Sequence, residues 1–418
     1  MSCCLPFNPP SPHKAILSRK RTQYFSPSFL CSQKQEPKLI LHDSLDAAGI
    51  DTKLARAARE GFCQQAGRIT EINSQTSIAI SRGADLAKTA LHVAAEDDSL
   101  VSHSSVELPV ESYIDRLADL SFGFCSLCMP RSNAPPEVFL GNLEKYLYVH
   151  KGFHRTNVLT ETRALYLHSV LTCRSGSSVM LSLIYSETLK MLRVLGFLDF
   201  DVEIYFPHDP AGLPYGYHKL KSKLEDQAHI LTSKALLVEI LRNLKDAFWP
   251  FQYENYNSLF LRAAHASNHI YGPSIVGERY SESCSSTSGL EIASTKAAQH
   301  RLGRGVWTNV RFGDMRRALA ASERLVILTN DYQELRDYAI LLYHCGYYEE
   351  CLHNLRLYET FKEEGGHAQQ RSRLSQTHEL EEDAVRKLMA RVNLILGEEG
   401  WSESISRKSY WGQYQEPW

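Results

Sequence analysis

Apolar side chains recur at helical spacing along most of the chain, and this pattern predicts a helix-rich protein. Within the proline-flanked residues 109–120, Val110, Ile114 and Leu117 fall on one face of a helix. Two earlier stretches also have helical composition: residues 44–66, which carry a charged face, and residues 85–98.

The central block begins with a small polar turn at residues 174–178. The turn leads into a predicted helix with an apolar stripe, and Gly196 stands where a helix C-cap belongs. Residues 201–207 then alternate apolar with polar side chains, which predicts a strand stopped by Pro207.

Residues 208–230 contain Gly, Pro and Lys and are predicted to form a polar loop. Thr232 or Ser233 can cap the helix that follows, because both side chains accept hydrogen bonds from free helical N–H groups. Leucines line one face of this helix, and Trp249-Pro250 ends it.

The Ser-rich residues 277–300 are predicted to be a linker. Beyond them the chain is predicted to be helical again, from Val310 to Phe361. Within it, residues 339–359 place small and apolar side chains in a spacing that resembles one tetratricopeptide helix pair. We expect residues 362–418 to form a charged helix and a disordered tail.

The first 35 residues contain no Asp or Glu, and Glu36 is the first acidic residue. They are basic and rich in Ser and Pro, a composition typical of an organellar transit peptide. A merely disordered N-terminus is the alternative. We expect residues 1–40 to be a transit peptide or disordered, and the Ser/Pro-rich composition favours the chloroplast stroma as the location.

Composition excludes several classes of function. The net charge of -2 over 418 residues gives no electrostatic footprint for nucleic acid, and no run of about 18 apolar residues predicts a membrane span. The 10 cysteines are scattered, which is typical of reduced thiols rather than a disulfide framework. No phosphate-binding loop, dinucleotide fingerprint or calcium loop is present, so no cofactor is expected.

Three runs together suggest a family. The run over residues 166–207, YLHSVLTCRSGSSVMLSLIYSETLKMLRVLGFLDFDVEIYFP, resembles the SirB-type N-terminal domain, a branch of the transglutaminase-like superfamily. Residues 236–251 resemble a helix of that family, and residues 323–359 resemble its tetratricopeptide-like C-terminal segment. The resemblance spans roughly residues 95–360 and is greatest to a plant, plastid-targeted subgroup.

This resemblance implies an α+β, helix-rich fold. Residues 41–276 would form a transglutaminase-like domain with additional N-terminal helices. After the linker at residues 277–300, residues 301–361 would form a short helical-repeat region.

Active members of the superfamily carry a cysteine at the start of the central helix, followed by a histidine and an aspartate. Aligned on Gly176, that position falls at about Ser178, and Cys173 lies out of register upstream of the turn. The family's Gly-His pair is missing here. Its nearest remnant is His208 after Pro207, and His229 is a second candidate base in a polar loop.

Structural roles are favoured over chemistry for these residues. Ser177 and Ser178 are suited to helix capping, and Cys173 to the packing of a small buried side chain. Cys125 and Cys128 have the spacing of half a zinc site, but no second Cys pair lies at a suitable distance.

Two further groups of side chains could bind ions. His150 and His154 could share a helix face and hold a metal, yet no glutamate base stands between them. Lys219, Lys221 and Lys223 could contact an anion, but Glu225 and Asp226 follow at once, so a solvated loop is favoured.

The sequence therefore favours a non-catalytic plastid protein that binds other proteins, with no catalytic, cofactor-binding or metal-binding residue assigned. The alternative is a hydrolase or acyltransferase that uses Cys173 or Ser178 with His208 or His229. A regulator that senses a small ligand in a vestigial cleft is a third possibility.

Overall fold

The structure is a computed structural model, and it describes residues 39–71, 85–103, 106–130, 134–158, 161–205, 212–218, 232–251, 258–267, 297–303, 313–329, 331–366 and 376–409. Several predicted segments lie outside these residues: the transit peptide up to residue 38, most of the linker (residues 277–296) and the last nine residues of the tail. Residues 297–300, at the end of the predicted linker, are helical.

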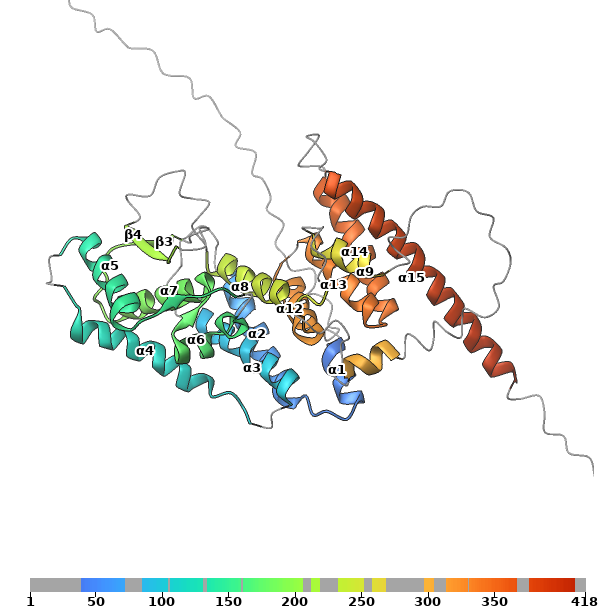
Figure 1. The fold of residues 1–418 in the computed structure, drawn as a ribbon, viewed down its shortest axis with the longest axis horizontal. Coiled ribbons are helices and arrows are strands. Elements are labelled where there is room, and N and C mark those ends of the chain that lie inside the picture. The colour runs from blue at the N-terminus through green and yellow to red at the C-terminus, as the bar shows by residue number, and fades with distance from the viewer. Residues whose placement is uncertain are drawn as a thin grey trace, which may run out of the picture. The chain divides into compact units, whose positions relative to one another are not determined.

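The described chain is helix-rich, as predicted, with four short strands (Figure 1). Helices of the first half are α1 (Ile40–Ala47), α2 (Lys53–Glu71), α3 (Leu86–Ser102), α4 (Val110–Leu127), α5 (Pro136–Glu144), the π-helix η1 (Lys145–His150), the 3-10 helix η2 (Thr162–Leu165), α6 (Leu167–Cys173) and α7 (Ser178–Val194). Those of the second half are α8 (Ser233–Phe248), α9 (Leu259–Ala266), α12 (Met315–Leu328), α13 (Tyr332–His344), α14 (Tyr348–Gly366) and α15 (Gln376–Ser409).

The strands form two small sheets. Strands β1 (His154–Arg155) and β2 (Ser175–Gly176) pair in parallel, and β3 (Val202–Tyr205) and β4 (Tyr215–His218) pair antiparallel. The strand predicted within residues 201–207 is confirmed. The polar loop predicted over residues 208–230 is wrong in part, because β4 lies within it and pairs with β3.

The stretch of helical composition over residues 44–66 is helical apart from a break between α1 and α2. Gly49 adopts φ +83°, a left-handed conformation that ends α1 at little steric cost. Asp46 then accepts a hydrogen bond from the Thr52 hydroxyl at 2.7 Å, which closes the connection. The helices predicted over residues 85–98 and 109–120 are confirmed as α3 and α4.

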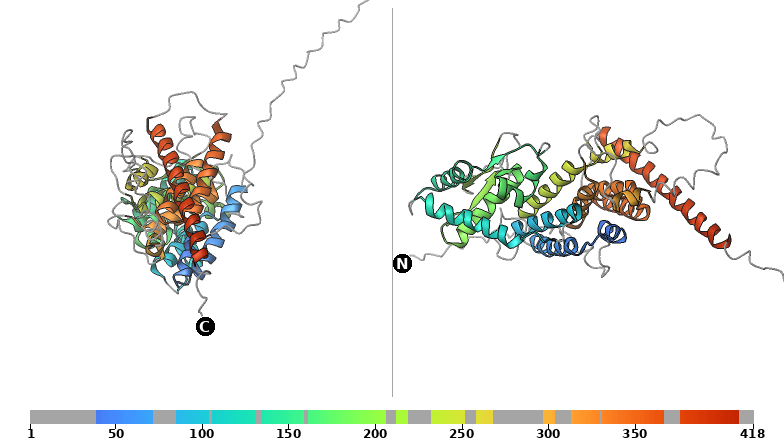
Figure 2. Two further views of the ribbon diagram at one scale, coloured as in Figure 1. Left: turned by 90° about the vertical axis from the view of Figure 1, so that its right-hand side faces the viewer. Right: turned by 60° about the horizontal axis from the view of Figure 1, so that its bottom comes forward.

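Two helices occupy the centre of the packing. Helix α7 is buried on nearly all sides and contacts α3, α4 and α8. Helix α13 is buried in the same way by α9, α12 and α14. A helix buried on nearly all sides is a core helix rather than a surface one, and Figure 2 shows both of them among their neighbours.

Helices α8 and α12 join the two halves of the chain. The Asp314 N–H at the start of α12 donates to the Phe248 carbonyl at the end of α8, at 2.9 Å. A Cβ on Gly313 would lie 2.3 Å from the Pro250 Cα, so this crossing requires glycine. The two helices then pack against each other.

No helix in the described parts of the chain is both long and apolar enough to span a membrane.

Candidate functional site

The start of α7 is the position at which the sequence suggested a nucleophile. Ser177 has extended backbone angles, and its hydroxyl accepts a hydrogen bond from the Met180 N–H at 3.2 Å. This is the geometry of an N-cap, in which a side-chain oxygen satisfies one free helical donor. The capping predicted for Ser177 or Ser178 is therefore confirmed, with Ser177 as the cap.

The turn before α7 is shaped by two backbone requirements. Arg174 adopts φ +61° and ends α6 in the left-handed region. A Cβ on Gly176 would lie 2.8 Å from Val170 Cγ1, closer than packed atoms tolerate. Arg174 therefore ends helix α6, and the chain turns back so that Gly176 lies against Val170. Only glycine fits at residue 176.

Ser178 is the first residue of α7 and is only 7% exposed. Its carbonyl accepts hydrogen bonds from within the helix, including one from the Ser182 hydroxyl at 2.9 Å. Cys173 is exposed, at the end of α6. The packing role predicted for Cys173 as a small buried residue is therefore wrong.

A carboxylate that the sequence did not single out holds this turn in place. Glu161 Oε2 accepts hydrogen bonds from the Ser175 hydroxyl at 3.2 Å and from the Thr156 hydroxyl at 3.3 Å. Since Ser175 and Thr156 lie at the two strands of the β1–β2 pair, Glu161 bridges them. Both bonds are donated to the carboxylate, so it acts as an acceptor that fixes the loop.

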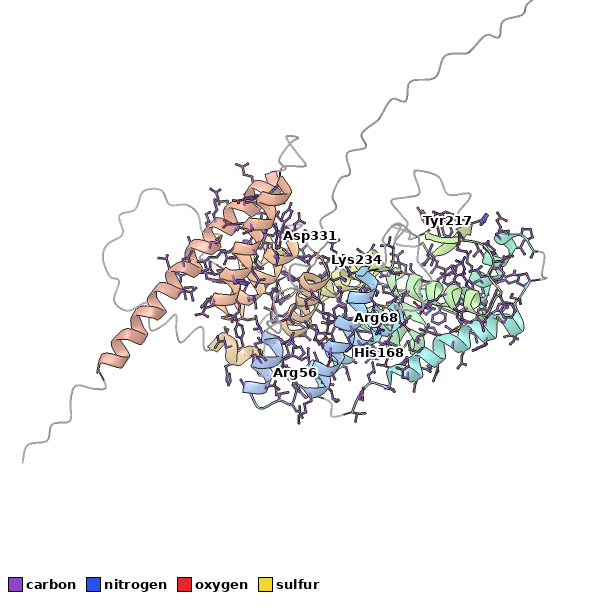
Figure 3. All side chains as sticks on the ribbon, turned by 180° about the vertical axis from the view of Figure 1, so that it is seen from behind. Arg56, Arg68, His168, Tyr217, Lys234 and Asp331 are labelled. Atoms are coloured by element: carbon purple, nitrogen blue, oxygen red, sulfur yellow. The ribbon has the colours of Figure 1, made fainter. Side chains whose placement is uncertain are left out.

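The described histidines near the turn make other contacts. His154 is opposite Ser175 in the β1–β2 register but is exposed, and its Nδ1 lies 3.1 Å from the Gly152 carbonyl oxygen. His168 on α6 lies 3.0 Å from the Ser169 hydroxyl, and burial lowers its pKa (Figure 3). Within the described residues, no hydrogen bond joins either imidazole to Ser178 or Cys173.

The remaining candidates do not assemble into a site in the described residues. Cys125 and Cys128 lie at the end of α4, and His150 and His154 are exposed. Across the described ranges, no group of three or more His, Cys, Asp or Glu side chains could hold a metal ion. The other candidates lie outside the described residues: His208, Lys219, Lys221, Lys223 and His229.

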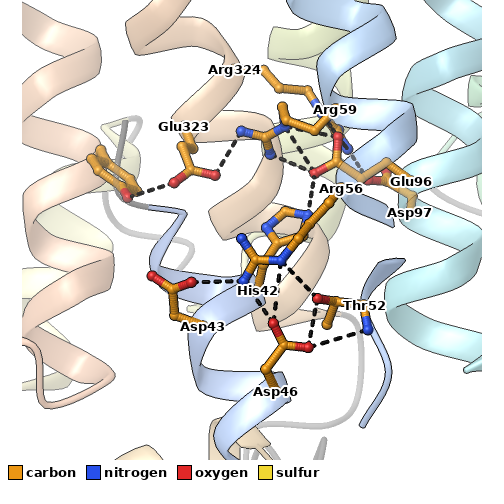
Figure 4. A network of polar contacts seen from close by, with 11 residues as sticks. His42, Asp43, Asp46, Thr52, Arg56, Arg59, Glu96, Asp97, Glu323 and Arg324 are labelled. Atoms are coloured by element: carbon orange, nitrogen blue, oxygen red, sulfur yellow. Dashed lines mark hydrogen bonds and ion pairs between the residues drawn. The ribbon is translucent and has the colours of Figure 1, made fainter. Parts of the chain in front are cut away.

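The most extensive polar assembly lies elsewhere, between α1, α2, α3 and α12 (Figure 4). Glu96 on α3 accepts hydrogen bonds from Arg59 Nε at 2.8 Å and from Arg324 Nε at 3.1 Å. Asp97 accepts from Arg324 at 2.6 Å, and Glu323 from Arg59 at 2.7 Å. We call these five side chains the inner ion network.

Neighbouring groups complete the inner ion network. His42 Nε2 on α1 lies 3.2 Å from Glu96 Oε1, and both side chains are 0% exposed. The Tyr166 hydroxyl donates to Asp97 at 2.8 Å, and the Tyr338 hydroxyl to Glu323 at 3.3 Å. The network therefore reaches from α1 to α13 through buried side chains.

Electrostatics explains why buried carboxylates are tolerated here. Burial alone would raise the pKa of Glu96, but the Arg324 and Arg59 guanidinium groups outweigh it and hold that pKa well below its usual range. Because a buried charge without a partner is costly, each member depends on the others.

A second buried cluster ties α8 to α13. Lys245 Nζ lies 2.7 Å from Glu334 Oε2 and 2.8 Å from Asp337 Oδ2, and all three side chains are less than 10% exposed. Burial lowers the pKa of Lys245, but the two carboxylates more than offset it and raise that pKa. Arg336 extends the cluster to Glu381 on α15 at 2.8 Å.

Sequence reasoning placed none of these ionic residues in the core. Arg59 belongs to the stretch that was assigned a charged face, and Arg324 is separated from Glu96 by 228 residues. No spacing rule connects residues so far apart. The only available signal was that the charges occur within helices that also carry apolar stripes.

Residues 111–195 match the profile of the Transglutaminase-like superfamily. The matched range runs from α4 to the end of α7 and contains the turn, the Ser177 cap and the Glu161 bridge. No curated protein and no solved structure matches the chain. The chain therefore contains a transglutaminase-like domain.

Proposed function

We propose that this protein is non-catalytic and binds or scaffolds other proteins through a degenerate transglutaminase-like domain and the helices that follow it. The observation that carries the proposal is the start of α7. The position that the resemblance aligns with the nucleophile is Ser178 rather than a cysteine, Ser178 is 7% exposed, and the neighbouring Ser177 hydroxyl is used as a helix cap.

The chemistry of acyl transfer supports this proposal. A cysteine mechanism needs a thiolate beside its base, and a serine needs still stronger activation. The described imidazoles of His154 and His168 are directed to a backbone carbonyl and to a neighbouring hydroxyl instead. Helix α7 is buried on nearly all sides, so its role in this proposal is to support the packing of the domain.

The C-terminal helices supply a second line of support. Helices α12, α13, α14 and α15 pack in succession, each against the next, and stacked helices of this kind build extended contact surfaces. The Lys245 cluster joins this stack to α8. A partner would therefore bind a surface whose helices are fixed in place by buried ion pairs.

We further propose that the protein acts in the plastid stroma. The support is the acid-free composition of the first 35 residues. Fusion of residues 1–60 to a fluorescent protein tests this: plastid fluorescence is expected, and a cytosolic signal would contradict the proposal.

Complementation of a null mutant tests the non-catalytic role. Cys173→Ala, Ser178→Ala, His208→Ala and His229→Ala each remove one candidate catalytic group, and all four variants are expected to restore function. Protein abundance is measured in every line. Arg324→Met serves as the control for loss of function through unfolding, since it disrupts the inner ion network.

The exposure of Cys173 is the one observation that favours the alternative, a hydrolase or acyltransferase. If Cys173→Ala and either histidine variant fail to complement at normal abundance, the protein is an enzyme. If only variants of reduced abundance fail, the scaffold role stands.

A further inference from the structure

A small cavity lies between α2 and α3, outside the transglutaminase-like domain, and the segment over residues 106–110 forms its third wall. Its volume is about 70 Å³. An apolar cavity of about 150 Å³ holds benzene, so this one has room for a group of about three or four heavy atoms. Its apolar lining includes Leu54 and Ala57 from α2, Ala95 from α3 and Leu108.

The wall contributed by α3 is held in a defined position by glycine. A Cβ on Gly61 would lie 2.6 Å from His92 Cε1 and 2.7 Å from His92 Nε2. The His92 imidazole therefore lies directly against the α2 backbone, and it also lines the cavity. Burial lowers the pKa of His92, so near neutral pH the ring presents a nitrogen lone pair that can accept a hydrogen bond.

A second polar group in the lining has no partner. Ser99, at 8% exposure, is more than nine-tenths buried and belongs to the cavity wall. Its hydroxyl forms no hydrogen bond with any residue that the structure describes. The Ser99 hydroxyl is therefore available to form a hydrogen bond with a polar ligand in the cavity.

The charge around the opening is negative. Asp98 and Glu107 line the cavity and are exposed. The nearby cation Lys88 is already bonded to Glu111, with Nζ 2.5 Å from Oε1. Two carboxylates beside a neutral ion pair favour a ligand with a positive charge.

We propose that this cavity binds a short aliphatic amine in its protonated form. The alkyl chain would lie on the alanine and leucine lining. The ammonium group carries three N–H donors and no acceptor, which complements the Ser99 hydroxyl oxygen, the His92 lone pair and the rim carboxylates. The size of the cavity restricts the chain to about two to four carbons.

Titration of the full-length protein with n-propylamine at pH 7.5, where it is the ammonium ion, tests the proposal. Resonances of His92, Ser99 and the Ala57 and Ala95 methyl groups are followed by NMR. Saturable shifts confined to these residues are expected. Propan-1-ol and propionate, which have the same chain length without the positive charge, are expected to bind about tenfold more weakly or not at all.

Three variants locate the site. Asp98→Asn and Ser99→Ala should each weaken n-propylamine binding by about fivefold to tenfold, and Ala95→Leu should abolish it by filling the cavity. Asp119→Asn removes an exposed carboxylate of α4 that does not line the cavity, and it should leave binding unchanged. Circular dichroism confirms that each variant is folded.

Several outcomes would overturn the proposal: no saturable shift with n-propylamine, equal binding of propan-1-ol, or undiminished binding by the folded Ala95→Leu variant. Equal weakening by Asp119→Asn would also overturn it, since it would show only a general attraction of cations. None of these outcomes bears on the non-catalytic role, which is tested by the α7 and histidine variants.

Discussion

Arg324 on α12 and Glu96 on α3 form an ion pair that solvent does not reach, with Nη2 2.9 Å from Oε2 and both side chains 0% exposed. Asp97 accepts from the same guanidinium at 2.6 Å. One arginine of the C-terminal half therefore pairs with two adjacent carboxylates of the N-terminal half, and Arg59 supplies Glu96 with a second positive charge. The stability of either half depends on this contact.

Replacement of Arg324 by methionine should lower the free energy of unfolding by about 3–5 kcal/mol, because it leaves buried carboxylates without a partner. The matched control is Arg56→Met. Arg56 binds Asp43 and Asp46 at 2.7 Å but is 38% exposed, so its loss should cost about 1 kcal/mol or less. Urea denaturation measures both. A cost below that of Arg56→Met would show that the inner ion network contributes little.

His344 should make stability depend on pH between about 6.5 and 4. Burial lowers its pKa from 6.5 to about 4, although the hydrogen bond to the Ala263 carbonyl opposes the shift. Because the folded pKa is depressed, the contribution is fully present above pH 6.5 and is lost as pH falls towards 4. A difference of about 2.5 pKa units corresponds to about 3 kcal/mol.

The His344→Phe variant isolates this effect, since it preserves the packing on Phe251, whose ring centroid lies 4.2 Å from that of His344. Its unfolding free energy should fall less steeply with acidification than that of the unmodified protein. His353→Gln, an exposed position on α14, should leave the slope unaltered. Equal slopes for all three proteins would contradict the expectation.

Ser177→Ala should cost about 1 kcal/mol, because the Met180 N–H loses its acceptor at the start of α7. Ser182→Ala is the control. The Ser182 hydroxyl only donates to the Ser178 carbonyl of its own helix at 2.9 Å, so its removal should cost less. Thermal unfolding compares the two, and a larger effect at Ser182 would argue against Ser177 as the cap.

Gly176→Ala should destabilise the protein by about 1–3 kcal/mol, since the new methyl group would meet Val170 Cγ1 at 2.8 Å. Combining it with Val170→Ala should cost about 1 kcal/mol less than the sum of the two single changes. Gly141→Ala, on α5 with nothing within 4 Å of the new Cβ, should be neutral or slightly stabilising. If the destabilisation by the double substitution equals the sum of the two single effects, residues 170 and 176 do not contact each other.

Helix caps and turns were the features of the fold that could be predicted from the sequence. Thr232 caps α8 by accepting from the Ala235 N–H at 3.1 Å, and Gly196 follows the C-cap of α7 at φ +79°. Each of these features depends on residues within one turn of each other. The turn at residues 174–178 was identifiable for the same reason.

Features that depend on distant partners were missed. Strand β4 was not predicted, because its residues have the composition of a loop. Tyr215–His218 forms a strand through its hydrogen-bonded pairing with β3. The inner ion network was missed for a related reason, since charged side chains on a helix are usually solvated. Only the three-dimensional packing of α2, α3 and α12 turns Arg59 and Glu96 inward.

The separation of Glu96 and Arg324 by 228 residues has a consequence for the newly made chain. At roughly 5–20 residues per second, ribosomes need on the order of 10–45 seconds to add Arg324 after Glu96 has been made. During that delay Asp97 lacks its arginine partner, and Glu96 has only Arg59. Burial of Asp97 before Arg324 is made would be costly, so we expect this part of α3 to stay hydrated until then, which is the state that a nascent-chain chaperone would encounter.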